Sequence, residues 1–349
     1  MTQYNLYFTL DYEIHGNGDG DPMQLMVEPT YRLMNLLEKF HQRLTIMADV
    51  AEILCFKRYR TETGRDDYHV VEIEEQLRDA IRRGHEVQLH IHSSYFNAVH
   101  NGHSFDQCIE EYNMAALPIE RIDEMVTECI AYLENLLRPV KKDYNVWLFR
   151  AANWSMMPTE NLYKVLVKHG ITHDTSVFKG GVQGGNVCYD YREAYDNLFA
   201  YPASAKNINE RDEKGKLIEL PIYTEMRPFW DFVSVVRIFR MIRAKFHRHK
   251  HAAVKTSESA NANKNDNRKL SLKSFFRLSP LKMDFNQVNS RGLKRMMRNV
   301  IKKVESGKWK VESVDVVLIG HAKTFVPYNE RTLEPFLKWI DKNINIQII

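Results

Sequence analysis

Short apolar segments alternate with amphipathic helical segments along most of this 349-residue chain. Each apolar segment has the length of a buried strand, and the segments between them repeat apolar residues at three- and four-residue intervals. This alternation is typical of a mainly parallel α/β sheet or barrel. The predicted strands are Leu6–Leu10, Leu44–Ala48, Val87–Ile91, Val146–Phe149, Ile171–His173, Leu217–Ile222 and Val314–Ile319. The predicted helices are Pro29–His41, Val71–Arg83, Ile119–Leu137, Asn161–His169, Gly292–Val304 and Arg331–Ile340.

Acidic, histidine and arginine side chains lie at the ends of these predicted strands. Because the carboxyl ends of parallel strands meet at one face of such a fold, we expect these side chains to gather there. Their chemistry is that of a metal or acid–base site. The candidate residues are Asp11, Glu13, Asp49, His90, His92, Ser94, Arg150, Trp154, Asp174, His321 and Lys323.

Two pairs with a spacing of two residues carry the metal hypothesis. In an extended chain such residues point to the same side, so Asp11 and Glu13 face one cavity, as do His90 and His92. Two imidazoles and a carboxylate form a common catalytic metal arrangement, and the second carboxylate can accept a proton from water. The structural alternatives are a pair of solvated carboxylates and a pair of hydrogen-bonded core histidines.

Arg150 and His321 supply the remaining candidate chemistry. Arg150 follows a buried segment and therefore needs a carboxylate partner, for which Asp11 and Asp174 are both candidates. His321 follows an apolar strand and a glycine, where it can act as a general acid. Lys323 either serves the substrate or is exposed to solvent.

Composition and motifs exclude several other classes of protein. With 44% hydrophobic and 27% charged residues, the chain is globular, and we expect a single domain over 1–349. Its start lacks the features of a signal peptide, and no apolar segment reaches the length of a membrane span. Its four cysteines lie far apart, which favours a reducing, cytoplasmic location. A dinucleotide cofactor and a serine nucleophile are unsupported, because no GxGxxG or GxSxG motif is present.

One insertion makes the protein basic. Residues 243–282 hold eleven Lys and Arg residues against two acidic residues, a net charge of +9, whereas the whole chain carries +4. Apolar residues from Phe232 to Phe246 recur at helical spacing among arginines, so residues 232–282 are candidates for contact with an anionic membrane face or another polyanion. The alternative is an ordinary barrel helix followed by a partly flexible loop. Nucleic acid is not supported, because no recognition motif accompanies the charge.

Several segments resemble the motifs of the polysaccharide deacetylase superfamily, in the order expected of that family. These segments are FTLDYE, RRGHEVQLHIH, FRAANW, HDTSV, IELPI and VVLIGHAKTF. The resemblance covers residues 5–225 and 310–330 and is greatest to a surface-polysaccharide-synthesis subgroup with an LHxH motif. It implies a distorted (β/α)7 barrel and a metal-dependent esterase that removes N-acetyl groups from a sugar of a polysaccharide, its precursor or a glycolipid.

The resemblance also implies roles for individual residues. Asp11 would be the catalytic base, held by Arg150, and His321 would protonate the leaving amine. Glu13, His90 and His92 would bind a divalent metal, with Zn²⁺ first and Co²⁺, Mn²⁺ or Ni²⁺ as alternatives. The supporting or substrate residues would be Asp49, Ser94, Trp154, Asp174 and Lys323.

Two departures from the family pattern concern the metal. Many members carry two adjacent aspartates where this chain has Asp-Tyr-Glu. Many also place the second metal histidine four residues after the first, at the position of Ser94, so His92 must replace it. Two other functions stay open: a glycoside hydrolase that uses Asp11 and Glu13, and a non-catalytic barrel recruited to membranes by its basic insertion.

Overall fold

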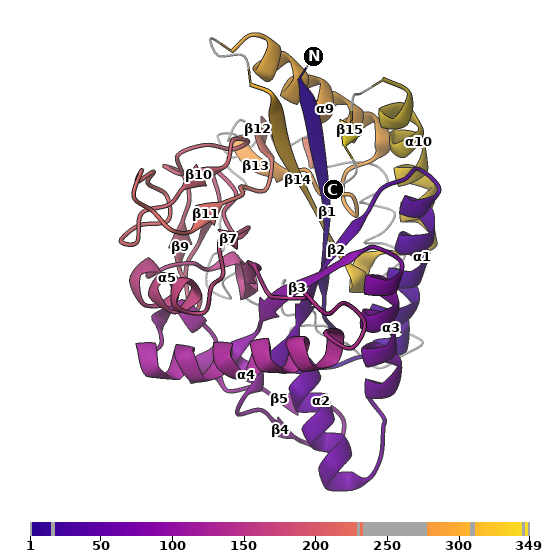
Figure 1. Cartoon of the computed structure of the whole chain (residues 1–349), viewed down its shortest axis with the longest axis vertical. Coiled ribbons are helices and arrows are strands. Elements are labelled where there is room, and N and C mark those ends of the chain that lie inside the picture. The colour runs from indigo at the N-terminus through magenta and orange to yellow at the C-terminus, as the bar shows by residue number, and fades with distance from the viewer. Residues whose placement is uncertain are drawn as a thin grey trace, which may run out of the picture.

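A mostly parallel sheet forms the centre of the molecule, with helices packed around it (Figure 1). The computed structural model describes residues 2–14, 18–228, 231–232, 278–307, 311–343 and 346–347. The strand order in the sheet is β10-β11-β7-β6-β3-β2-β1-β14, and β15 pairs with the start of β1. Every pairing in this sheet is parallel except that of β10 with β11.

All of the predicted strands form, and several reach further toward their carboxyl ends than predicted. They are β1 (Gln3–Tyr12), β2 (Leu44–Asp49), β3 (Glu86–Ile91), β6 (Leu148–Ala151), β7 (His173–Asp174), β11 (Ile218–Glu219) and β14 (Ser313–His321). The strands that complete the sheet are β10 (Tyr201–Pro202) and β15 (Ile346–Gln347). Three antiparallel pairs lie outside it: β4 (Val99–His100) with β5 (Phe105–Asp106), β8 (Val182–Gln183) with β9 (Tyr189–Asp190), and β12 (Thr224–Pro228) with β13 (Leu278–Lys282).

The sheet curls back on itself after β11. Ile222 forms a parallel bridge with Val317 of β14, and the backbone N–H of Tyr223 donates to the Val317 carbonyl at 3.2 Å. On the other side, the N–H of Ile222 donates to the Val177 carbonyl, just beyond β7, at 2.9 Å. The expected distorted (β/α)7 barrel is therefore confirmed. The contact of Ile222 and Tyr223 with Val317 closes it.

Each of the six predicted helices that lie within the described residues is present. They are α1 (Glu28–Glu38), α3 (Val70–Arg82), α4 (Ile119–Leu137), α5 (Thr159–Lys168), α9 (Ser290–Glu305) and α10 (Pro327–Asn343). Short helical turns are η1 (Met23–Val27), η2 (Ser93–Tyr95), η3 (Ile109–Glu111), η4 (Met114–Ala116), η5 (Ala152–Trp154) and η7 (Ala322–Thr324).

Helix α2 (Val50–Thr63) was not predicted. It contacts β3, α3 and α4, so its buried residues are spread over more than one side and show no single apolar stripe. The side chain of Asp49 accepts from the backbone N–H of Glu52 at 3.4 Å and caps the start of the helix. Gly64, at φ +72°, ends it in the left-handed conformation.

The buried interior explains why the central strands are mostly apolar. Every residue of β2 is buried, and so are most residues of β1 and β3. A strand that is covered on both faces needs apolar side chains on both. The four cysteines lie apart as free thiols.

Part of the predicted basic insertion can be located. Leu278–Lys282 forms β13, paired with β12, while the predicted helix beyond Phe232 and the rest of the insertion lie outside the described residues. Within the described ranges, none of the helices is both long enough and apolar enough to cross a membrane.

Candidate active site

The carboxyl ends of five strands bring the candidate residues together. In the register of the sheet, Asp11 on β1 lies beside His321 on β14. His90 on β3 lies beside Asp49 on β2 and Arg150 on β6. The sheet topology thus places residues from distant parts of the sequence at one face of the barrel.

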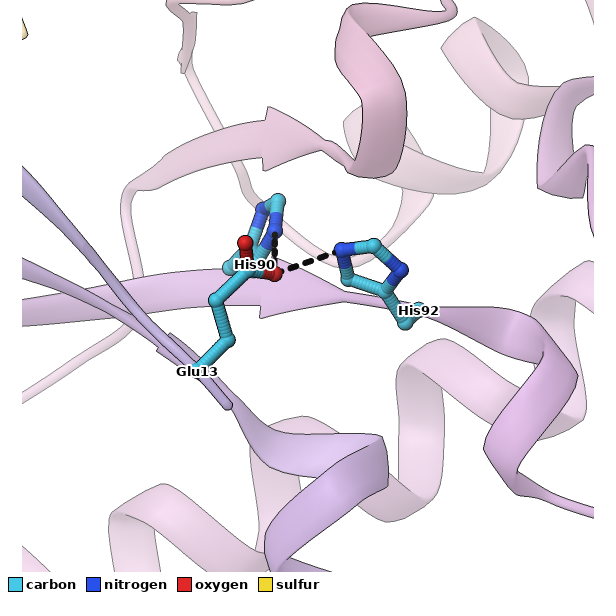
Figure 2. A group of neighbouring side chains, drawn as sticks. All are labelled: Glu13, His90 and His92. Atoms are coloured by element: carbon cyan, nitrogen blue, oxygen red, sulfur yellow. Dashed lines mark ion pairs between the residues drawn. The ribbon is translucent and has the colours of Figure 1, made fainter. Parts of the chain in front are cut away.

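Glu13, His90 and His92 form a compact, buried group (Figure 2). The Oε2 atom of Glu13 lies 2.6 Å from Nε2 of His92 and 3.4 Å from Nε2 of His90. One potential ligand atom from each residue lies within 4.8 Å of the others. In the part of the chain that the structure describes, no other group of three His, Cys, Asp or Glu residues meets this criterion. His92, and not Ser94, therefore belongs to this group.

The surroundings of His90 favour the orientation that a metal ligand needs. Its Nδ1 lies 2.8 Å from the backbone carbonyl of Arg150, so the ring donates there and directs Nε2 toward Glu13. Burial alone would lower the pKa of His90, but the hydrogen bond to Glu13 and the nearby Asp11 raise it to about 9. Without a metal ion, this ring thus carries a proton that a cation would replace.

Lys323 is a partner of Glu13 and not a solvent-exposed side chain. Its Nζ donates to Oε1 of Glu13 at 2.7 Å, and its side chain is only 8% exposed. Burial would raise the pKa of Glu13, but Lys323 and His92 hold it well below its usual range. Glu13 is therefore ionised, with one oxygen bound by Lys323 and the other directed toward the two imidazoles.

Arg150 is fully buried and is paired with Asp11, one of its two predicted partners. Its Nη1 donates to Oδ1 of Asp11 at 2.5 Å, its Nη2 to the Thr9 hydroxyl at 2.7 Å, and its Nε to the Thr175 carbonyl at 2.9 Å. Burial would raise the pKa of Asp11, but the Arg150 guanidinium and His321 lower it. Asp11 is therefore an ionised carboxylate that Arg150 holds in one orientation.

His321 contacts the second oxygen of the same carboxylate, with its Nε2 3.3 Å from Oδ2 of Asp11. Its backbone is held on both sides by Asn286, which accepts from the His321 N–H at 3.0 Å and donates to the His321 carbonyl at 3.2 Å. The ring of Trp154 meets the His321 ring edge-on, with the centroids 5.9 Å apart. Trp154 therefore lies beside the candidate acid.

Three predicted residues lie close to the site without joining the metal group. The hydroxyl of Ser94 donates to Gln107 at 2.7 Å. Asp49 accepts from the backbone N–H of His92 at 3.0 Å, so it supports a ligand and caps α2. Asp174 accepts from the hydroxyl of Ser176 at 2.8 Å, and the alternative of a salt bridge from Arg150 to Asp174 is wrong, because the donors of Arg150 go elsewhere.

Sequence reasoning missed several residues of this site. Thr9 lies two residues before Asp11 on the same strand, so the period of two could have placed it on the same face. Glu52 follows the helix cap Asp49 by three residues, and its Oε2 accepts from the backbone N–H of Ile14 at 3.0 Å. No local pattern identifies Asn286, which reaches His321 from a separate loop.

Asp174 has a buried acidic neighbour, Glu219, directly opposite on β11. Burial and the Asp174 charge raise the pKa of Glu219 well above its usual range. Glu219 and Asp174 thus form a buried acidic pair, and burial next to Asp174 disfavours the charged form of Glu219. This pair is not part of the metal group.

Substitution of Glu219 by Gln should make stability less dependent on pH. A raised folded-state pKa contributes stability below about pH 4.5, and this contribution is lost as the pH rises, by up to about 1.4 kcal/mol per pH unit. Glu219→Gln should therefore gain stability relative to the parent between about pH 5 and 8, as measured by urea unfolding across that range. The exposed Glu193→Gln is the matched control, and a pH-independent difference for Glu219→Gln would contradict the raised pKa of Glu219.

Comparisons with known proteins bear on the fold. No family model and no curated protein match the chain. Among solved structures, Puue allantoinase aligns with 11% identity over 100% of this chain and 87% of that chain, at a TM-score of 0.50. A protein assigned as a polysaccharide deacetylase from Pseudomonas aeruginosa PAO1 aligns with 12% identity over 100% of this chain and 88% of that chain, at a TM-score of 0.48. Another protein assigned as a polysaccharide deacetylase, from Mycobacterium smegmatis, aligns with 13% identity over 99% of this chain and 87% of that chain, at a TM-score of 0.47. At these identities the likeness concerns the α/β barrel fold.

Proposed function

We propose that this chain, which has the barrel fold of the polysaccharide deacetylases, is a metal-dependent carbohydrate N-deacetylase. The observation that carries the proposal is one juxtaposition. The donor group of Glu13, His90 and His92 lies beside Asp11, an ionised carboxylate that is bound by Arg150 and touches His321. A cation site next to an oriented base and a histidine suits metal-assisted hydrolysis of an amide.

The donor set fits a divalent cation. A carboxylate oxygen and two imidazole nitrogens suit Zn²⁺ first, and Co²⁺, Mn²⁺ or Ni²⁺ as well. The hydrogen bond from His90 to the Arg150 carbonyl supports this assignment, since metal-binding histidines usually donate their other N–H in this way. When bound, a divalent cation supplies Lewis-acid polarisation of the acyl carbonyl.

The chain's own residues handle the protons. Asp11 is ionised and can remove a proton from water, while Arg150 and Thr9 keep its carboxylate in place. His321 touches the other oxygen of Asp11, so a proton can pass between the two groups and reach the departing amine. Trp154 packs edge-on against His321, so it lies next to these two groups.

The glycoside hydrolase alternative fits the site less well. Such enzymes need one carboxylic acid that stays protonated near neutral pH. The partners of Asp11 and Glu13 lower the pKa of both carboxyl groups, so neither is suited to be that acid. A non-catalytic barrel is expected to have lost some of its metal-binding residues, whereas three buried donor groups converge here.

We also propose a cytoplasmic location, with contact to an anionic membrane face or another polyanion through residues 232–282. The contact with an anionic partner is supported by the net charge of +9 over residues 243–282. Because Leu278–Lys282 is paired with β12, a deletion that tests this should be confined to residues 247–277. Loss of co-sedimentation with anionic vesicles would support the contact, and unchanged sedimentation would refute it.

Product analysis tests the proposed reaction. The zinc-loaded protein is incubated with an N-acetylated sugar oligomer, and free acetate and new reducing ends are measured in the same samples. Acetate release without new reducing ends is expected. New reducing ends would favour the glycoside hydrolase, and the absence of both products across a panel of N-acetylated oligomers and sugar phosphates would contradict the proposal.

A further inference from the structure

A cavity that is not part of the metal group lies beside β12 and α9. Its volume is about 390 Å³, within the roughly 300–1,000 Å³ of typical ligand pockets. The lining residues come from the loops after β7 and β9, from β12 and from α9. They are Lys179, Gly180, Arg192, Asp196, Asn197, Thr224, Met226 and Lys303. This set is called the Lys179 cavity below.

The lining of the Lys179 cavity is predominantly cationic. Lys179, Arg192 and Lys303 carry positive charge, against one lining carboxylate, Asp196. Asp190, which does not line the cavity, forms an ion pair with Arg192. This pair reduces the net charge around the cavity, but the net charge stays positive. A cavity with this charge favours an anionic ligand.

The one lining carboxylate already has its hydrogen-bond partners. Asp196 accepts from Lys303 at 2.9 Å and from the backbone N–H groups of Leu198 and Phe199 at 2.7 and 3.0 Å. Lys179 contacts only a backbone carbonyl within the described part of its surroundings, that of Tyr195 at 3.5 Å. The ammonium groups thus have N–H protons left to donate to a ligand, whereas the Asp196 carboxylate already accepts hydrogen bonds from its neighbours.

A line of aromatic and basic side chains joins the Lys179 cavity to the candidate active site. Phe178, the neighbour of Lys179 in the chain, packs edge-on against Trp154, with the ring centroids 5.6 Å apart. Nζ of Lys282 lies 3.2 Å from the centre of the Trp154 ring and 4.5 Å from that of Phe178. Trp154 in turn meets His321. These contacts connect the loop that carries Lys179 with the residues around His321.

We propose that the Lys179 cavity binds a phosphate-ester group of the substrate whose N-acetyl group is hydrolysed at Asp11. The link to the substrate rests on the proposed function, but the binding of phosphate does not. A soluble sugar phosphate and the phosphate of a lipid-linked sugar share this chemistry.

Calorimetry at low salt tests the cavity directly, with inorganic phosphate and N-acetylglucosamine 1-phosphate as probes and N-acetylglucosamine as the neutral comparison. Lys179→Gln should weaken binding of both phosphates by about tenfold or more, since hydrogen bonds to charged groups are worth about 1.5–3 kcal/mol. Lys57→Gln is the matched control. It lies in a cavity of about 470 Å³ beside α2 and α4, where Arg58 and Arg121 are balanced by Glu62 and Glu128.

Two results would overturn the proposal: no phosphate binding by the parent protein, or an equal loss in the Lys179→Gln and Lys57→Gln variants. Binding that depends on Lys179 in a protein without acetate release would uphold the anion site and reject only the proposed function. Vesicles that contain phosphatidic acid form a separate arm. Lys179-dependent binding there favours a lipid-linked source, and binding of the sugar phosphate alone favours a soluble one.

Discussion

The variant Asp11→Asn should lose acetate release by about 10²–10⁴-fold in kcat, the usual contribution of a positioned general base. The amide keeps the shape of the carboxylate and can still accept a hydrogen bond from Arg150, but it cannot accept a proton. Zinc content should stay near that of the parent, because Asp11 is not in the group of Glu13, His90 and His92. Steady-state acetate release and metal analysis of the same preparation check both statements.

Asp315→Asn is the matched control for this prediction. Asp315 lies on β14 at the opposite end of the sheet, where it accepts from Asn5 of β1 at 2.8 Å. The same chemical change on the same pair of strands should leave kcat close to that of the parent. Equal activity of Asp11→Asn and Asp315→Asn would eliminate Asp11 as the base.

The variant His90→Ala should bind Zn²⁺ at least about 100-fold more weakly than the parent, because loss of a ligand exceeds the roughly 10–100-fold cost of losing an outer partner. Only Glu13 and His92 would remain of the three converging donors. Metal-dependent stabilisation should fall in parallel, since a ligand at 100 times its Kd adds about 2.7 kcal/mol to the stability. Competition with a chromophoric chelator and thermal unfolding with and without Zn²⁺ measure these effects.

His173→Ala controls for the loss of an imidazole from a barrel strand. His173 is the first residue of β7 and packs edge-on against Trp147, with the ring centroids 5.2 Å apart, away from the metal group. This variant should keep the zinc affinity of the parent. If both histidine variants bind zinc as the parent does, the metal lies elsewhere and the proposed chemistry fails.

The fold was largely predictable because a strand that is buried on both faces consists mostly of apolar residues, and such a segment can be recognised in the sequence. The segment Leu44–Ala48 is apolar at every position except Thr45, and β2 is indeed buried throughout. Helix α2 escaped prediction for the opposite reason. It contacts other elements on several sides, so its apolar residues do not repeat with one period.

The partners of the candidate residues were less predictable. Arg150 had two plausible carboxylates in the sequence, and only the positions of β1, β6 and β7 in the barrel separate Asp11 from Asp174. Lys323 could have faced solvent, yet it is buried against Glu13. Trp154 and Lys282 are 128 positions apart in the sequence, and no local pattern brings an ammonium onto that ring.

By itself, the sequence determined which chemical groups stand at the ends of the strands, because strand ends and residue types are local properties. Spacing by two residues also determined that Glu13 shares a face with Asp11, and His90 with His92. Tertiary structure alone decided which groups touch: the three-donor cluster, the choice of Asp11 by Arg150, and the cationic cavity at Lys179. Such contacts depend on the order and curvature of the strands in the barrel, and this arrangement arises only when the whole core packs.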